Sequence, residues 1–219
     1  DPAPAAFFSL EMSARQLVIR MLCSEARIDS NLVRGGYLSA HDWTPLTNVA
    51  GILSAAPIFI DDTPGISIRE IRSKARRLKK EQNIGIVFID YLQLITDPHQ
   101  RLESRQIEIS NISRSLKSLA REIDCPIITL SQLSRKVESR EDRRPILSDL
   151  RESGAIEQDA DLVLFLYRDE VYNKNSEDKG TGELIIGKQR NGPLGTIRVT
   201  FLKEFTSFKP FEGMLQEPG

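Results

Sequence analysis

Short apolar runs alternate with amphipathic helical segments along most of this 219-residue chain, and that alternation restricts the fold more than any other feature. The apolar runs have the length and the Ile, Val, Leu and Phe content of buried strands. They cover residues 6–10, 57–62, 84–89, 126–130 and 162–166. The helical segments cover residues 13–28, 43–53, 67–80 and 109–123. Strands that alternate with helices predict an α/β fold with a mainly parallel sheet flanked by helices.

Local signals support these elements. Ser13 and Gln16 have the spacing of a capping box, and so do Ser67 and Glu70, which places a helix start at each pair. In the last third of the chain, Asn191-Gly192 separates two strand-like segments, and this predicts a C-terminal antiparallel hairpin.

The apolar run that begins at residue 84 continues through residues 91–95, and we expect it to form a central strand. No linker or internal repeat interrupts the pattern, so we expect a single domain over residues 1–219. The first strand begins without a preceding crossover element, which indicates a truncated N-terminal edge.

Composition excludes several classes of protein. The chain has 30 Lys and Arg against 31 Asp and Glu, so a uniformly basic protein that coats nucleic acid is excluded, and any DNA-binding surface has to be local. No apolar run approaches a membrane span and no secretory signal precedes the first strand, so we expect a cytoplasmic protein. Two cysteines without a C-x-x-C spacing predict reduced core thiols, and two histidines are too few for a His-rich metal site.

Polar residues stand where several predicted strands end. Glu11 follows the first run, Asp90 ends the third and Gln132 follows the fourth. Ligands of open α/β sheets collect at the carboxyl ends of the strands, so these side chains are candidates for a common site. A strand that ends in Asp fits a Walker B element, whose carboxylate positions Mg²⁺. The simpler alternative is a loop cap, because residues 57–62 have the same form.

Longer motifs extend this interpretation. In chain order they are FFSLEMS at residues 7–13, VFIDYLQL at 87–94, LSQLSR at 130–135, DLRESG at 149–154 and GKQRNGP at 187–193. These segments resemble successive motifs in the RecA-like ATPase domain of DnaB-type replicative helicases. Ordered motifs of this length are far more specific than one short pattern. The resemblance runs from about Phe7 to about Phe211 and implies a RecA-like P-loop NTPase core that uses ATP and Mg²⁺.

The resemblance also implies roles for the strand-end residues. Glu11 would be the catalytic carboxylate that polarises the attacking water, and Asp90 would be the Walker B acid that holds Mg²⁺ through water. Gln132 would sense the γ-phosphate. Arg20, on the helix after Glu11, is expected to face the phosphates as well.

Two further sets of residues follow from the resemblance. Lys188 and Arg190 would project into the nucleotide site of the neighbouring subunit, with Arg190 as the arginine finger; without the resemblance they fit a solvated basic hairpin. Arg151, Glu152 and Gly154 match the channel loop that grips the backbone of single-stranded DNA, where the alternative is an ordinary charged loop.

One departure from the family is clear. The sequence has no G-x-x-x-x-G-K-[ST] phosphate loop, and residues 1–5 look unrelated to the family. We therefore interpret residues 1–219 as a truncated motor domain that is catalytically deficient by itself.

The resemblance implies a homohexamer in the intact protein, with single-stranded DNA, a primase and a helicase loader as partners and no membrane. Two alternatives stay open at this point. The chain fits another RecA-like ATPase of recombinase or clock type, or a non-catalytic module for oligomerisation or interaction.

Overall fold

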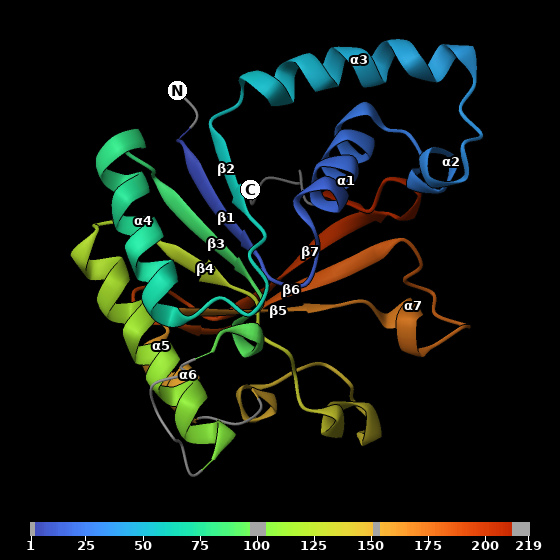
Figure 1. Ribbon diagram of the computed structural model, residues 1–219. Coiled ribbons are helices and arrows are strands. Elements are labelled where there is room, and N and C mark those ends of the chain that lie inside the picture. Colours follow the sequence, from blue (N-terminus) through green and yellow to red (C-terminus); the bar gives the residue numbers. More distant parts are fainter. Residues whose placement is uncertain (1–2, 97–103, 151–153, 212–219) are drawn as a thin grey trace, which may run out of the picture. The chain divides into compact units, whose positions relative to one another are not determined.

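The computed structural model describes residues 3–96, 104–150 and 154–211 (Figure 1). The chain divides into two compact units. The first consists of Asp1–Ile19, Ala50–Ser134 and Leu150–Ala160, and the second of Arg20–Val49, Arg135–Asp149 and Asp161–Gly219. The expectation of a single domain over residues 1–219 stays a prediction.

The first unit contains a four-stranded, fully parallel sheet in the order β2-β1-β3-β4. Its strands are β1 (Ala5–Ser9), β2 (Ile58–Asp61), β3 (Ile86–Asp90) and β4 (Ile127–Thr129). All four agree with the strands predicted from the apolar runs. Because the strands are parallel, their carboxyl ends lie along one edge of the sheet.

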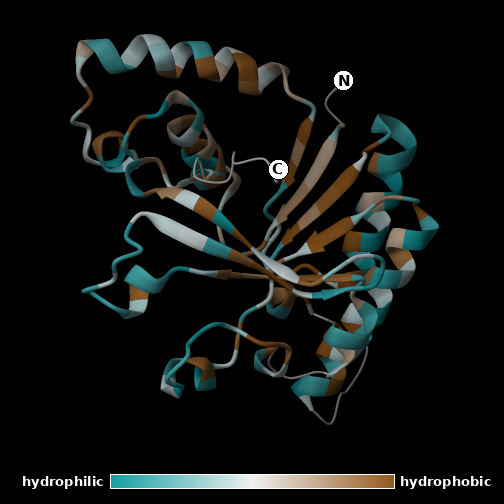
Figure 2. Cartoon of the chain, turned by 180° about the vertical axis from the view of Figure 1, so that it is seen from behind, coloured by the Kyte–Doolittle hydropathy of each residue, from teal (hydrophilic) through white to brown (hydrophobic). Residues whose placement is uncertain are grey.

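Helices α4 (Ile68–Gln82), α5 (Arg105–Glu122) and α6 (Gly154–Asp159) belong to the same unit, and α4 and α5 lie along one side of the sheet in Figure 1. Their apolar stripes meet the inward residues of the strands in one buried core. That core includes Phe8, Ile71, Val87, Ile89, Ile109, Ile112 and Leu119. Figure 2 shows the strands of this sheet mostly brown, whereas the helices also carry hydrophilic faces. The sheet is therefore held by apolar burial against α4 and α5.

Helix starts follow the predicted capping sequences. At the start of α1 (Ala14–Ala26), the Ser13 amide donates to Gln16 Oε1 at 3.0 Å and the Gln16 amide donates to Ser13 Oγ at 3.3 Å. Ser67 and Glu70 form the equivalent capping box at α4. Two more helices, α2 (Ser30–Gly35) and α3 (Ala40–Ala55), follow α1 in sequence.

The second unit contains a four-stranded antiparallel sheet in the order β5-β6-β7-β8. Its strands are β5 (Leu162–Tyr167), β6 (Thr181–Gln189), β7 (Gly195–Leu202) and β8 (Ser207–Pro210), and the short helix α7 (Asp169–Tyr172) follows β5. The predicted hairpin is confirmed as β6 and β7. It is part of a larger sheet, because β5 and β8 pair with its two outer edges.

The prediction of a continuous strand through residues 91–95 is wrong. Strand β3 ends at Asp90, and Leu92–Leu94 form a turn of 3-10 helix. The physical reason is in the spacing of the buried side chains: Leu92 and Ile95 are both buried, and a separation of three places them on one face of a 3-10 turn. Alternation along a strand would have put them on opposite faces.

Among the residues that the structure describes, no helix combines the length and the apolar character that a membrane span requires. Cys23 and Cys125 are free and buried, as the sequence predicts.

Candidate functional site

The carboxyl edge of the parallel sheet brings together three of the predicted site residues. Ser9 pairs with Asp90 in the register of β1 and β3, so Glu11 follows closely after the strand position that faces Asp90. The Leu10 amide donates to the Asp90 carbonyl at 2.7 Å. Gln132 follows β4, the strand on the other side of β3. Glu11 and Gln132 are exposed and Asp90 is half-buried, so this edge is accessible to a ligand.

A hydrogen-bonded bridge fixes Gln132 relative to the turn that follows β3. The side-chain amide of Gln93 donates to Ser131 Oγ at 3.0 Å, and its Oε1 accepts from the Gln132 amide at 3.2 Å. The Leu92 amide also donates to the Leu130 carbonyl at 2.9 Å. Sequence reasoning did not single out Gln93 or Ser131, although both lie inside the quoted motifs.

The end of β2 contributes two carboxylates to the same edge. Asp61 pairs with Lys74 Nζ at 2.6 Å. Partial burial works to raise the pKa of Asp61, but hydrogen bonds from Lys74 and Thr63 outweigh it and the pKa is lowered. The neighbouring Asp62 accepts from the Ala14 amide at 2.7 Å. From the sequence, the run at residues 57–62 served only as an example of a strand that ends in Asp as a loop cap.

The chemistry of these residues fits Mg²⁺ held in part by a nucleotide. Across residues 3–96, 104–150 and 154–211, no group of three or more His, Cys, Asp or Glu side chains is placed to hold a metal ion. Mg²⁺ usually keeps several waters and takes one or two carboxylates together with substrate phosphates. Asp90 at the strand end matches that mode of binding, and a site made entirely of protein ligands is not present in the described part of the chain.

Arg20, Lys188 and Arg190 lie in the second unit. Arg20 is an exposed residue of α1. Lys188 is in β6 opposite Val163, and Arg190 comes directly after the strand. The Arg190 amide donates to the Asp161 carbonyl at 3.0 Å, and its guanidinium Nε is 3.6 Å from Asp161 Oδ1. This ion pair is solvent-exposed, so it stabilises the strand end only weakly.

A β-bulge precedes Lys188. The pairing of β5 with β6 shifts between Val163 and Leu164, which leaves Gly187 as the extra residue on β6. A Cβ at Gly187 would lie 2.4 Å from a ring carbon of Phe165. Glycine is therefore required by space at this position, and the bulge sets the direction in which the following residues continue.

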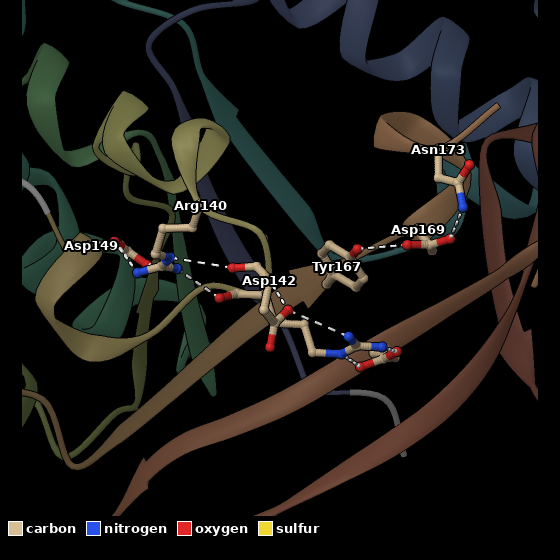
Figure 3. Close-up of polar contacts among 8 residues, drawn as sticks. Arg140, Asp142, Asp149, Tyr167, Asp169 and Asn173 are labelled. Carbon is tan, nitrogen blue, oxygen red and sulfur yellow. Dashed lines mark hydrogen bonds and ion pairs between the residues drawn. The ribbon is translucent and has the colours of Figure 1, made fainter. Parts of the chain in front are cut away.

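The predicted DNA-binding loop is described only in part. Arg151 and Glu152 lie outside the described residues, and Gly154 is the exposed first residue of α6. Before the loop, Asp149 is 3% exposed and receives two hydrogen bonds from the guanidinium of Arg140, at 3.0 and 2.7 Å (Figure 3). Asp149 also accepts from the Ile146 amide at 2.9 Å. Asp149, which precedes the predicted loop in sequence, is therefore fixed by three hydrogen bonds.

Close to this ion pair in sequence, Arg144 covers the ring of Tyr167. The guanidinium carbon of Arg144 is 4.9 Å from the ring centroid. The guanidinium nitrogens donate to both carboxylate oxygens of Glu183, at 2.8 and 2.6 Å. Tyr167 donates its hydroxyl proton to Asp169 at 2.8 Å (Figure 3). Burial and this hydrogen bond raise the pKa of Tyr167 to about 12.

Comparison with known proteins identifies the family. Residues 1–210 match the family described as DnaB-like helicase C terminal domain. The chain belongs to this family. The resemblance of the motifs and the RecA-like α/β fold are thereby confirmed.

Its relatives include replicative helicases. The chain is 57% identical over 212 residues to the replicative DNA helicase DnaB of Geobacillus stearothermophilus, a match that covers 97% of this chain and 47% of that protein. It is 55% identical over 214 residues to the replicative DNA helicase DnaC of Bacillus subtilis (strain 168), with 98% and 47% covered. The chain thus spans about half the length of these relatives.

Solved structures agree with the assignment. A DnaB-like replicative helicase, solved in a study of its interactions with primase, superposes with a TM-score of 0.91 at 44% identity and covers 95% of this chain and 51% of that one. A separately solved ATPase domain gives the same TM-score and identity and covers 95% and 75%. A KaiC-like protein from Pyrococcus horikoshii has a TM-score of 0.56 at 19% identity and shares the fold alone.

Proposed function

We propose that this chain is the motor part of a ring-shaped replicative helicase that uses ATP hydrolysis to move along single-stranded DNA and separate the duplex. The observation that carries the proposal is the common position of Glu11, Asp90 and Gln132 at one sheet edge, in a chain of the DnaB-like family. The names of the most similar proteins, which are replicative DNA helicases, support it.

Each strand-end residue has a distinct task in this proposal. When bound, Mg²⁺ neutralises phosphate charge and ATP supplies the phosphoryl group that water attacks. Asp90 would hold the metal through its water, and Glu11 would accept a hydrogen bond from the attacking water and polarise it. Gln132 would contact the γ-phosphate with its side-chain amide. The bridge through Gln93 would couple that contact to the strand that carries Asp90.

Basic residues complete the proposed site. Arg20 would face the phosphates of its own subunit. Lys188 and Arg190 would reach the nucleotide of the neighbouring subunit in a homohexamer, where a guanidinium stabilises the charge that develops during phosphoryl transfer. Their position at the end of β6, after the bulge at Gly187, is compatible with projection from the sheet.

DNA binding is proposed for the loop at Arg151, Glu152 and Gly154. An arginine together with backbone amides suits contact with phosphates without reading of bases. Such local binding is compatible with a chain whose net charge is −1.

The wider setting of the proposal is the replication fork in the cytoplasm, with a primase and a helicase loader as partners. A solved DnaB-like helicase whose interactions with primase were studied supports the first of these partners. The clock-type alternative gains no support from the KaiC-like protein, because that protein shares only the fold. The replicative helicases named above favour neither the recombinase nor the oligomerisation alternative.

ATP hydrolysis by the full-length protein tests the assignment of Glu11. We expect Glu11→Gln to lower kcat by about 100-fold or more, since the amide cannot act as the base. Glu25→Gln, the same change at an exposed position of α1, serves as the matched control and should leave kcat unchanged. Residues 1–219 alone should hydrolyse ATP only at background, because they contain no phosphate loop. Full hydrolysis by the Glu11→Gln protein would refute the assignment.

A further inference from the structure

Glu11 lies in a short turn that connects β1 to α1, and the entry to this turn is fixed by hydrogen bonds. Ser9 is buried, with 2% of the residue exposed, and its Oγ donates to the Met12 carbonyl at 2.6 Å, which closes the turn around Glu11. The Leu10 amide is tied to the Asp90 carbonyl at 2.7 Å. The backbone just before Glu11 is therefore anchored to the strand that ends in Asp90.

The exit from the turn is fixed by a residue that is distant in sequence. Asp62 Oδ2 accepts from the amide of Ala14, the first residue of α1, at 2.7 Å. The two residues are 48 positions apart, and the parallel pairing of Phe8 with Asp61 brings them together. The first amides of a helix have no partner within the helix, and a carboxylate there also interacts favourably with the helix dipole.

The capping box of α1 uses the amides of Ser13 and Gln16, so the Ala14 amide can donate to Asp62. Ser13 and Gln16 satisfy each other in a capping box, so a cap for the helix is already present in the local sequence. The bond from Ala14 to Asp62 adds a tie between the end of β2 and the far side of the Glu11 turn. Asp61 does not compete for it, because its carboxylate pairs with Lys74.

We propose that Asp62, together with Ser9, is a positioning residue that holds the Glu11 carboxylate in place for catalysis. Ser9 fixes the turn before Glu11 and Asp62 fixes it after Glu11, so the exposed carboxylate is carried on a backbone that is restrained on both sides. The inference rests on the proposed role of Glu11. It extends that role to a residue outside the motifs that define the family resemblance.

The test compares two identical substitutions at helix starts in the full-length protein. Asp29 caps α2 by accepting from the Asn31 amide at 2.8 Å, so Asp29→Ala is a matched control for Asp62→Ala. Each change should lower stability by a similar small amount, as the loss of a cap. Because small displacements of a reacting group are costly, we expect Asp62→Ala to lower kcat by about 10- to 100-fold and to leave KM for ATP nearly unchanged. Asp29→Ala should leave both constants unchanged.

A structural measurement accompanies the kinetics. Hydrogen exchange of the segment that contains Glu11 and Ala14 should become faster in Asp62→Ala and stay unchanged in Asp29→Ala. Asp62→Asn keeps an acceptor oxygen for the Ala14 amide and should retain most of kcat. If Asp62→Ala does not fold, Ser9→Ala provides the second arm, because it removes the bond to the Met12 carbonyl on the other side of the turn.

The outcomes separate this inference from the function on which it rests. If Asp62→Ala and Ser9→Ala hydrolyse ATP like Asp29→Ala while Glu11→Gln is inactive, Glu11 keeps its role and the positioning inference is wrong. If Glu11→Gln remains active, the proposed function fails at its own residue. Loss of kcat in Asp62→Ala, restored in Asp62→Asn, supports the inference.

Discussion

The stability of the second unit is expected to depend on pH through the buried hydroxyl of Tyr167. Its pKa is raised to about 12 by burial and by the hydrogen bond to Asp169, whereas an unfolded chain has a tyrosine pKa of about 10. The neutral phenol is therefore favoured in the folded state. The resulting stability is complete below about pH 10 and is lost as the pH rises toward 12.

Urea unfolding at pH 9 and at pH 11 measures this effect. We expect the free energy of unfolding to be lower at pH 11 than at pH 9. The decrease should be smaller in Tyr167→Phe, because phenylalanine has no hydroxyl proton to lose. Tyr37→Phe is a control, because Tyr37 is 78% exposed. An equal fall in the wild-type and Tyr167→Phe proteins would show that Tyr167 does not contribute.

The sequence suggests several individual residues of the candidate site, and others could not be found from it. Glu11, Asp90 and Gln132 follow from one rule, since parallel strands place their carboxyl ends together. Ser9 and Asp62 could not be assigned, because their proposed roles depend on two hydrogen bonds: one closes the turn after β1, and the other follows from the pairing of β1 with β2.

At the scale of elements, the bulge at Gly187 changes the direction of β6 just before Lys188 and Arg190. Gly187→Ala would push a methyl group into Phe165, and we expect it to lower the free energy of unfolding by about 1–3 kcal/mol through overpacking. Gly195→Ala is the matched control on the neighbouring strand, because a Cβ there has nothing within 4 Å. Urea denaturation of both variants is the measurement, and equal stabilities would contradict the proposed packing.

The elements themselves were predicted best where local signals and burial agree. Both capping boxes, the parallel strands and the hairpin have signals in the sequence that the structure confirms. The sequence wrongly predicts a strand in the turn after Asp90, because a mostly apolar run does not show which residues share a face. The pairing of β5 with β6 depends on contacts between distant segments, which short-range patterns do not encode.

At the scale of the whole molecule, the proposed motor requires cooperation between subunits. The strand-end residues of the first unit would bind and activate the nucleotide, and Lys188 and Arg190 would act on the site of a neighbour. The resemblance of the segment at residues 187–193 suggests this division, but composition and periodicity do not, since the partner surface belongs to a second copy of the chain. Family membership supports it, and the chain covers about half of each full-length relative.

Strand separation by the full-length protein tests the central claim most directly. A forked DNA duplex with single-stranded tails is incubated with the protein and ATP, and release of the labelled strand is followed over time. We predict that release requires ATP and Mg²⁺ and is lost in Glu11→Gln, whereas Glu25→Gln unwinds like the wild type. Robust ATP hydrolysis by the wild-type protein without release of the strand, on forks of either tail polarity, would contradict the assignment as a helicase motor.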